Sequence, residues 1–322
     1  MLSEFELIRR YFTHPAPHTR LGVGDDAAVI RPRNGMELVV TVDMLVSGTH
    51  FFADAEPERL GHKALAVNLS DIAAMGAVAR WTTLALALPA VEPRWLRKFA
   101  SGFMRLARRH DVALIGGDTT RGPLAICVQV LGEVPAGQAL LRSGARVGDD
   151  VWVSGRIGDA ALAIAARKGR VKLATREWSA VRRRLDAPMP RLALGAALRG
   201  IATSAIDISD GLCADLGHIC ERSKVAAVIE FERLPVSAAA RKRLDSRVVR
   251  AAVLTGGDDY ELCFTARPGR REAVCAAAER AEVPVTRVGR IERVLKRGAR
   301  VTIADRRGRP MALTHGGYEH FR

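Results

Sequence analysis

Seven aspartates recur in one kind of position along the chain. Each ends an apolar run, stands beside glycine in a predicted turn, or interrupts the apolar face of a helix; they are Asp26, Asp43, Asp71, Asp118, Asp207, Asp210 and Asp258. An ionised carboxylate in such a place is costly unless a cation, a set of hydrogen-bond donors or a metal holds it. If the seven converge, oxygen-only ligands favour Mg²⁺, which usually also binds substrate phosphates. The pattern therefore indicates nucleotide chemistry.

Asp71 has the most informative surroundings. The stretch 57–77 is rich in helix formers and begins with Pro57 and Glu58, so it predicts a helix. On a 3.6-residue period, Asp71 shares one stripe with the apolar side chains of Leu60, Ala64, Val67 and Met75. A carboxylate that merely reaches water at the helix end explains this helix equally well. The six other aspartates in similar positions favour a binding site over this explanation.

Other nucleotide signatures are missing from the sequence. The chain has no P-loop, no dinucleotide-binding glycine motif after a first strand, and no pair of protein-kinase motifs. No Ser-His-Asp arrangement can be told from chance by its spacing. The aspartates therefore carry the prediction.

The predicted elements alternate between strands and helices, which indicates an α/β or α+β fold whose strand order is not readable. A strand over 37–42 puts Asp43 at its end, with Thr41 on the same face. A strand over 112–115 runs into the glycines before Asp118. The other predicted helices cover 3–12, 93–110, 159–167, 177–201 with a break at Pro188 and Pro190, 212–222 and 237–254. The other predicted strands include 82–88, 124–132, 150–154, 205–208 and 226–231. A glycine-rich stretch marks a boundary between domains 1–136 and 137–322.

Composition describes an ordinary globular protein. The chain has 322 residues and 48% hydrophobic content, enough for two cores. It contains neither a membrane span of about 18 apolar residues nor a signal peptide at the N-terminus. Five cysteines, without zinc-site spacing, indicate buried thiols in a reducing cytosol. We therefore expect a cytoplasmic protein without a membrane partner.

The net charge of +15 raises the alternative of a nucleic-acid-binding protein. The basic residues are scattered, however, and aromatic residues make up only 5% of the chain. The stacking surface of a single-strand binder is therefore missing. Solvated helix faces explain the charge better, and nucleic acid is not an expected partner.

Nine segments, in order and over nearly the whole chain, resemble thiamine-monophosphate kinases. They are 22–28, 41–46, 50–51, 63–77, 115–120, 142–145, 207–212, 256–262 and 317–321. The acid-rich N-terminal motifs are shared with aminoimidazole ribonucleotide synthetase and selenophosphate synthetase. The His50 segment, the 256–262 run and the tail are more particular to the thiamine-phosphate enzymes. Another ATP-using member of this superfamily, such as an aminoimidazole ribonucleotide synthetase, is the nearest alternative.

The resemblance implies a two-domain fold like that of aminoimidazole ribonucleotide synthetase. An N-terminal mixed-sheet domain binds ATP and Mg²⁺ and dimerises, and a C-terminal α/β domain completes the active site. The implied reaction is direct, Mg²⁺-assisted phosphorylation of thiamine monophosphate by ATP to thiamine diphosphate, the last step of that biosynthesis. Because the acceptor is itself a phosphate, no dedicated general base is expected, and positioning and several metals do the work.

The resemblance also implies roles for single residues. The implied Mg²⁺ ligands are Asp26, Thr41, the backbone of Val42, Asp43, Asp71, Asp118, Asp207 and Asp210. The implied ATP contacts are Gly117, Asp118, Arg142 and Ser209. The implied thiamine-phosphate contacts are His50, Asp258 and Tyr318. The family usually has Glu at position 258, so the shorter side chain predicts a looser or water-mediated contact.

Three of these residues also have ordinary structural explanations. His50 can be a histidine packed beside Phe51. Asp210 can belong to a turn before a helix. Tyr318 can anchor the tail in the core.

Overall fold

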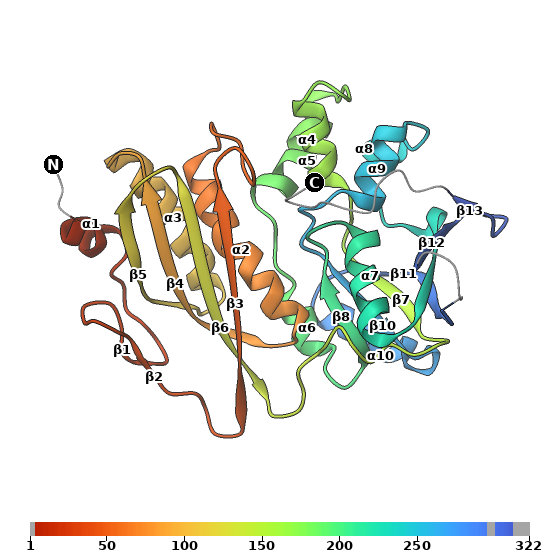
Figure 1. Cartoon of the computed structure of the whole chain (residues 1–322), viewed down its shortest axis with the longest axis horizontal. Coiled ribbons are helices and arrows are strands. Elements are labelled where there is room, and N and C mark those ends of the chain that lie inside the picture. The colour runs from red at the N-terminus through yellow and green to blue at the C-terminus, as the bar shows by residue number, and fades with distance from the viewer. Residues whose placement is uncertain (1–3, 295–299, 312–322) are drawn as a thin grey trace. The chain divides into compact units, whose positions relative to one another are not determined.

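The computed structural model describes residues 4–294 and 300–311 (Figure 1). They belong to two compact units. The first comprises Met1–Ile72 and Ala77–Gly137, and the second comprises Ala73–Gly76 and Gln138–Arg322. Within the described ranges, no helix is long and apolar enough to cross a membrane.

The first unit is built on a four-stranded sheet with the order β3-β6-β4-β5. Its strands are β3 (Met36–Val46), β4 (Val78–Leu88), β5 (Ala113–Arg121) and β6 (Ala125–Pro135). The β4–β5 pair is parallel and the other two pairs are antiparallel. The smaller elements are α1 (Glu4–Tyr11), β1 (Thr19–Leu21) and β2 (Val29–Ile30).

Two helices, α2 (Pro57–Ala74) and α3 (Pro93–Arg109), lie on one face of this sheet (Figure 1). Phe99 and Phe103 of α3 are fully buried, as are Ile126 and Val130 of β6. The backbones of α2 and α3 approach each other so closely that a Cβ at Gly102 would overlap the carbonyl group of Glu58, so only glycine fits there. This close contact excludes water from most of α2.

The second unit holds a seven-stranded sheet with the order β13-β12-β9-β11-β7-β10-β8. Its strands are β7 (Asp150–Ser154), β8 (Ala202–Asp207), β9 (Ala226–Glu230), β10 (Leu262–Ala266), β11 (Val285–Glu292), β12 (Val301–Ala304) and β13 (Pro310–Met311). Its helices are α4 (Asp159–Arg167), α5 (Thr175–Asp186), α6 (Leu192–Ala197), α7 (Leu212–Ser223), α8 (Ala238–Arg241), α9 (Arg247–Thr255) and α10 (Arg271–Arg280), with 3-10 turns η1 (Phe231–Arg233) and η2 (Pro268–Arg270).

The core of the second unit follows the alternation of side chains along β10. Leu262, Phe264 and Ala266 belong to a cluster with Trp152, with Leu194 of α6 and with Val274 of α10. Strand residues alternate between faces, so Cys263 belongs to the opposite face. The sheet therefore has a core on both sides, as the predicted mixed α/β class requires.

The predicted elements are present, but two aspartates lie elsewhere in them than predicted. Asp43 is inside β3 rather than at its end, because the ladder with β6 continues to the Val46–Ala125 pair. Asp118 is inside β5, since that strand continues through the glycines to Arg121. The β4–β5 register shifts between Leu114 and Gly116, which pair with Thr82 and Thr83, so Ile115 is the extra residue and both glycines stay in the ladder.

Candidate active site

In the first unit, β3 and α2 bring three of the predicted residues together. The Thr41 hydroxyl donates a hydrogen bond to Asp71 Oδ2 at 2.5 Å. Asp43 lies two residues from Thr41 on the same strand face, and both are half-buried. Burial, and then the nearby Asp43 carboxylate, raise the pKa of the Cys127 thiol. Thr41, Asp43 and Asp71 thus offer only oxygen ligands, two of them from carboxyl groups.

His50 follows β3 in a tight turn. Its Nδ1 accepts a hydrogen bond from the Val46 amide at 3.0 Å, and the amide of residue 50 donates to the Val46 carbonyl at 3.0 Å. Because Nδ1 is an acceptor, the neutral ring carries its proton on Nε2. The ring therefore closes the turn, and this fixes its orientation.

Asp118 is not brought to Asp43 within one chain. Their strands, β5 and β3, are the two edges of the sheet, separated by β4 and β6. Three strand spacings amount to about 14 Å. Asp118 is exposed, and a Cβ on the preceding Gly117, whose φ is +151°, would overlap the Leu84 carbonyl. The glycine is thus required for the strand to pass β4.

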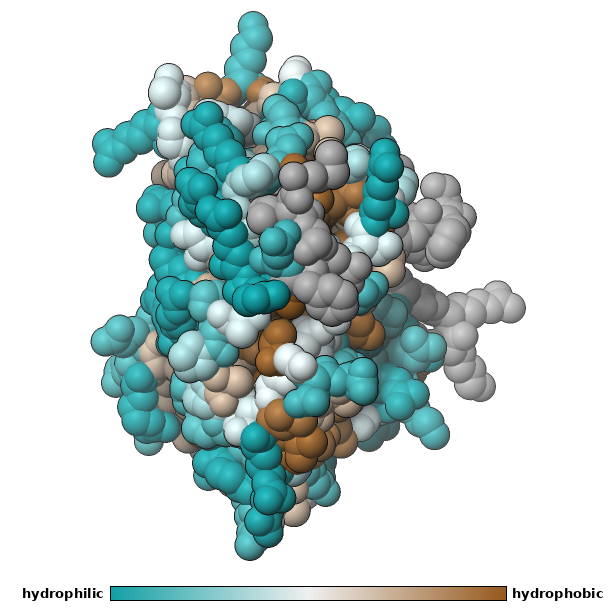
Figure 2. Space-filling view, turned by 90° about the vertical axis from the view of Figure 1, so that its left-hand side faces the viewer, coloured by the Kyte–Doolittle hydropathy of each residue, from teal (hydrophilic) through white to brown (hydrophobic). Residues whose placement is uncertain are grey.

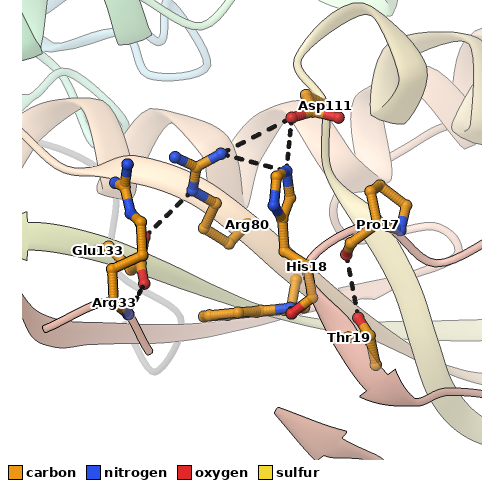
Figure 3. A network of polar contacts seen from close by, with 8 residues as sticks. Pro17, His18, Thr19, Arg33, Arg80, Asp111 and Glu133 are labelled. Atoms are coloured by element: carbon orange, nitrogen blue, oxygen red, sulfur yellow. Dashed lines mark hydrogen bonds and ion pairs between the residues drawn. The ribbon is translucent and has the colours of Figure 1, made fainter. Parts of the chain in front are cut away.

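Asp26 is exposed in the connection between β1 and β2. The chain around this connection is tied to the sheet by a polar network (Figure 3). His18 Nε2 lies 2.7 Å from Asp111 Oδ2, and Arg80 Nε donates to Glu133 Oε2 at 3.2 Å. Arg33 also donates to Glu133, from its amide and its Nε, at 2.7 Å each.

Glu133 is the buried acid of this network and is only 2% exposed. Burial by itself raises the pKa of its carboxyl, but the bonds from Arg33 and Arg80 outweigh that effect and lower the pKa. Glu133 is therefore ionised at neutral pH. It anchors the segment that leads into β3.

In the second unit, two loops lie side by side at the end of β8. The amides of Asp258 and Tyr260 donate to the carbonyls of Ser209 and Ile208, each at 2.8 Å, and the Ile208 amide donates to the Glu261 carbonyl at 2.8 Å. These bonds extend the β8–β10 ladder past Asp207. Four predicted residues therefore share one end of the sheet: Asp207, Ser209, Asp210 and Asp258.

The loop of Asp258 has an unusual backbone. Asp258 and Tyr260 both have positive φ, at +69° and +51°, and a Cβ on Gly257 would overlap the Ser209 carbonyl. The Tyr260 hydroxyl donates to Asp258 Oδ1 at 2.9 Å. The carboxylate is therefore oriented by its own loop.

Asp215, which lies in the first turn of α7, is not among the residues predicted from the sequence. Its Oδ2 accepts hydrogen bonds from three consecutive amides, those of Ser209, Asp210 and Gly211, at 3.0–3.1 Å. Burial and then the Asp210 charge raise the pKa of Asp215 to about 7, against the lowering effect of the three bonds. An acid in the first turn of a predicted helix was the available signal.

Sequence analysis also missed Glu261, whose carboxylate is fully buried. It accepts bonds from Ser154 Oγ and Arg191 Nε, both at 2.6 Å, from Arg191 Nη2 at 2.5 Å, and from Arg184 Nη2. Asp259, which lies between Asp258 and Glu261 in the sequence, accepts a hydrogen bond from the Gly158 amide at 2.7 Å. Burial raises the pKa of Asp259 well above 3.8.

Arg142 is exposed, and its loop is held by the last residue of α7. Ser223 Oγ accepts the amides of Gly144 and Ala145 at 3.1 and 3.2 Å and donates to the Arg142 carbonyl at 3.2 Å. Helix α7 has 12 residues, a length of about 18 Å. Arg142 and Asp210 therefore belong to loops at opposite ends of this helix.

Two predictions about the site concern Tyr318 and a cluster of metal ligands. Tyr318 lies outside the described residues. Among the residues that are described, no group of three or more His, Cys, Asp or Glu is arranged to hold a metal. Pairs of acids are present in each unit, which suits Mg²⁺ because that ion usually completes its shell with water and substrate phosphates.

The chain matches the family models of AIR synthase related proteins in both halves, the N-terminal domain over residues 24–134 and the C-terminal domain over 146–301. It is 42% identical to the thiamine-monophosphate kinase of Escherichia coli strain K12 over 323 residues, 99% of this chain and 98% of that protein. Among solved structures, the thiamine-monophosphate kinase of Stenotrophomonas maltophilia K279a has a TM-score of 0.83 and 48% identity, covering 89% of this chain and 91% of the other. AaThiL complexed with AMPPCP and TMP has a TM-score of 0.77 and 29% identity, covering 93% and 92%.

The two matched domains place the chain among the AIR synthase related proteins. Within that class, identity of this level over almost the whole length decides the family. The chain belongs to the thiamine-monophosphate kinases.

Proposed function

We propose that this protein phosphorylates thiamine monophosphate to thiamine diphosphate with ATP, by direct phosphoryl transfer assisted by Mg²⁺. The observation that carries the proposal is the full-length similarity to thiamine-monophosphate kinases, which include AaThiL complexed with AMPPCP and TMP. The free cysteines suit a reducing compartment, and we place the enzyme in the cytoplasm.

The oxygen-only groups are the proposed Mg²⁺ ligands. In the first unit these are Asp43 and Asp71 with Thr41, Asp26 and the backbone of Val42, and in the second unit they are Asp207 and Asp210. Bound Mg²⁺ would neutralise the phosphate oxygens during transfer. The Thr41–Asp71 hydrogen bond supports this assignment, since it orients a half-buried carboxylate on the same face as Asp43.

The remaining residues are assigned to the two substrates. Gly117, Asp118, Arg142 and Ser209 are proposed for ATP, and His50, Asp258 and Tyr318 for thiamine phosphate. The phosphate of thiamine monophosphate is ionised at neutral pH and attacks without a general base. The fixed orientations of His50 and of the Asp258 carboxylate support a recognition role, because preorganised groups lose little entropy on binding.

We further propose that the protein is a homodimer that uses the first unit's sheet. Edge strand β3 exposes an alternating apolar row, Leu38, Val40, Val42 and Met44, with exposed fractions of 42, 54, 57 and 57%. The side of the molecule that Figure 2 shows carries separate brown apolar patches among hydrophilic side chains, and these are not assigned to β3. A long apolar edge of this kind invites pairing with another chain.

The position of Asp118 suggests how the proposed dimer would contribute to the metal-binding site. At about 14 Å from β3, Asp118 cannot share a metal with Asp43 of its own chain. A partner whose β5 edge docks beside β3 would supply that carboxylate. The dimer would then complete the metal-binding set.

The deciding experiment measures ADP release with ATP and Mg²⁺, comparing thiamine phosphate with free thiamine as acceptor. We expect thiamine diphosphate from the monophosphate alone, and a loss of activity on the order of 100-fold or more in Asp71→Asn. The matched control is Asp150→Asn, which changes a buried aspartate in β7 that pairs with Arg271 and Arg287. No product from either acceptor would overturn the function and direct attention to other substrates of the superfamily. Full activity in Asp71→Asn would overturn the metal assignment alone.

A further inference from the structure

The loop Ser209–Gly211 is held from inside the second unit by a single carboxylate. Asp215 is 2% exposed, and its Oδ2 accepts all three consecutive amides of the loop. Asp215 also lies in the first turn of α7, close to the partial positive charge of that helix end. The loop therefore has a fixed backbone orientation that does not depend on a ligand.

This orientation decides which groups the loop can offer to a ligand. Consecutive backbone amides at the start of a helix form a ready-made site for phosphate when they point outward. Here the three amides point to Asp215, and the carbonyls of Ile208 and Ser209 accept the amides of Tyr260 and Asp258. These amides and carbonyls are thus already hydrogen-bonded within the protein, and the loop offers its side-chain oxygens to a ligand.

We propose that Asp215 is a positioning residue that makes this loop a cation-binding loop instead of a phosphate-binding one. By drawing the amides inward, it leaves the Ser209 hydroxyl and the Asp210 carboxylate as the groups that meet a Mg²⁺–nucleotide complex. The inference rests on the proposed function and assigns a role to a residue that itself touches neither metal nor substrate.

A purely structural role makes a different prediction. An acid in the first turn of a helix can act only as a cap, and its loss then lowers stability without changing metal binding. A positioning residue must alter the affinity for the metal as well. The two roles therefore separate when metal binding and stability are measured on the same variants.

The variants are Asp215→Asn, which keeps one acceptor oxygen but no charge, and Asp215→Ala, which keeps neither. Asp150→Asn is the matched control, since Asp150 is equally buried at 2% exposure but bonds to Arg271 and Arg287, away from the loop. Three quantities are measured: hydrogen exchange of the amides of residues 209–211, Mn²⁺ affinity in the presence of ATP by electron paramagnetic resonance, and the thermal midpoint.

We expect faster exchange of the three amides in Asp215→Ala, and Mn²⁺ affinity about tenfold weaker in Asp215→Asn and weaker still in Asp215→Ala. Asp150→Asn should lower the thermal midpoint and leave Mn²⁺ affinity unchanged. Wild-type Mn²⁺ affinity in a folded Asp215→Asn would overturn the proposal, whatever happens to Asp215→Ala. Neither exchange nor Mn²⁺ binding uses thiamine phosphate, so failure of the kinase assay alone would count against the proposed function and not against Asp215.

Discussion

Replacing Glu261 by glutamine removes a charge that two arginines share. The carboxylate is fully buried and accepts bonds from Arg184, Arg191 and Ser154. Glutamine keeps one acceptor oxygen and turns an amide donor toward a guanidinium group. The variant therefore leaves positive charge without a counter-ion at the base of the Asp258 loop.

The magnitude follows from burial. Removing one partner of a buried ion pair costs about 3–5 kcal/mol. The Arg184 and Arg191 side chains keep 26 and 16% exposure, so water can partly solvate them and the lower end, about 3 kcal/mol, is expected. For a unit of this size that corresponds to a drop of about 6–12 °C in the thermal midpoint.

Differential scanning calorimetry measures this shift, and Glu177→Gln is the control. Glu177 also pairs with two basic side chains, Lys242 and Arg243, but its own side chain is 18% exposed, against 0% for Glu261, and Lys242 is 70% exposed. A smaller shift is therefore expected in the control. If Glu261→Gln moved the midpoint no more than Glu177→Gln does, the buried charge would not be needed and the reasoning would be refuted.

Three further predictions concern other residues. Burial raises the pKa of Asp259 above 3.8, so the native state keeps a proton that the unfolded chain loses, and this residue's contribution to stability declines as pH rises. Asp259→Asn, which can still accept the Gly158 amide, should therefore lose less unfolding free energy than the wild type between pH 5 and pH 8 in urea unfolding. An equal loss in the two proteins would contradict this. Val40→Asp should shift the protein from dimer to monomer in light scattering, because it puts a charge in the centre of the apolar row, and an unchanged mass would exclude this sheet face as the interface. Ser223→Ala should raise the KM for ATP several-fold with little change in kcat, since it frees the loop of Arg142, and an unchanged KM would remove Arg142 from the nucleotide site.

Local patterns in the sequence were sufficient for most elements. The apolar period of 57–77 predicts helix α2 with Asp71 on its packed side, and the alternation in 37–43 correctly puts Thr41 and Asp43 on one face. The strand 150–154 has the predicted bounds. These features depend on periodicity and on residue preferences within a few positions, which the sequence displays directly.

Contacts between segments distant in the sequence determined the features that local patterns did not predict. Glycine in 116–117 signals a turn locally, but the ladder with β4 carries the strand through it and places Asp118 at an edge of the sheet. Glu261 meets Arg184 and Arg191 across 77 and 70 residues of chain, and its loop meets the Asp210 loop only because β10 pairs with β8. The sequence by itself determined where acidic side chains stand beside glycines, apolar runs and helix faces, and from this we predict which residues bind metal and phosphate. Which of them meet, and which buried acids hold their loops in place, was decided by the order of strands in the two sheets, because hydrogen bonds between distant segments leave no periodic trace in the chain.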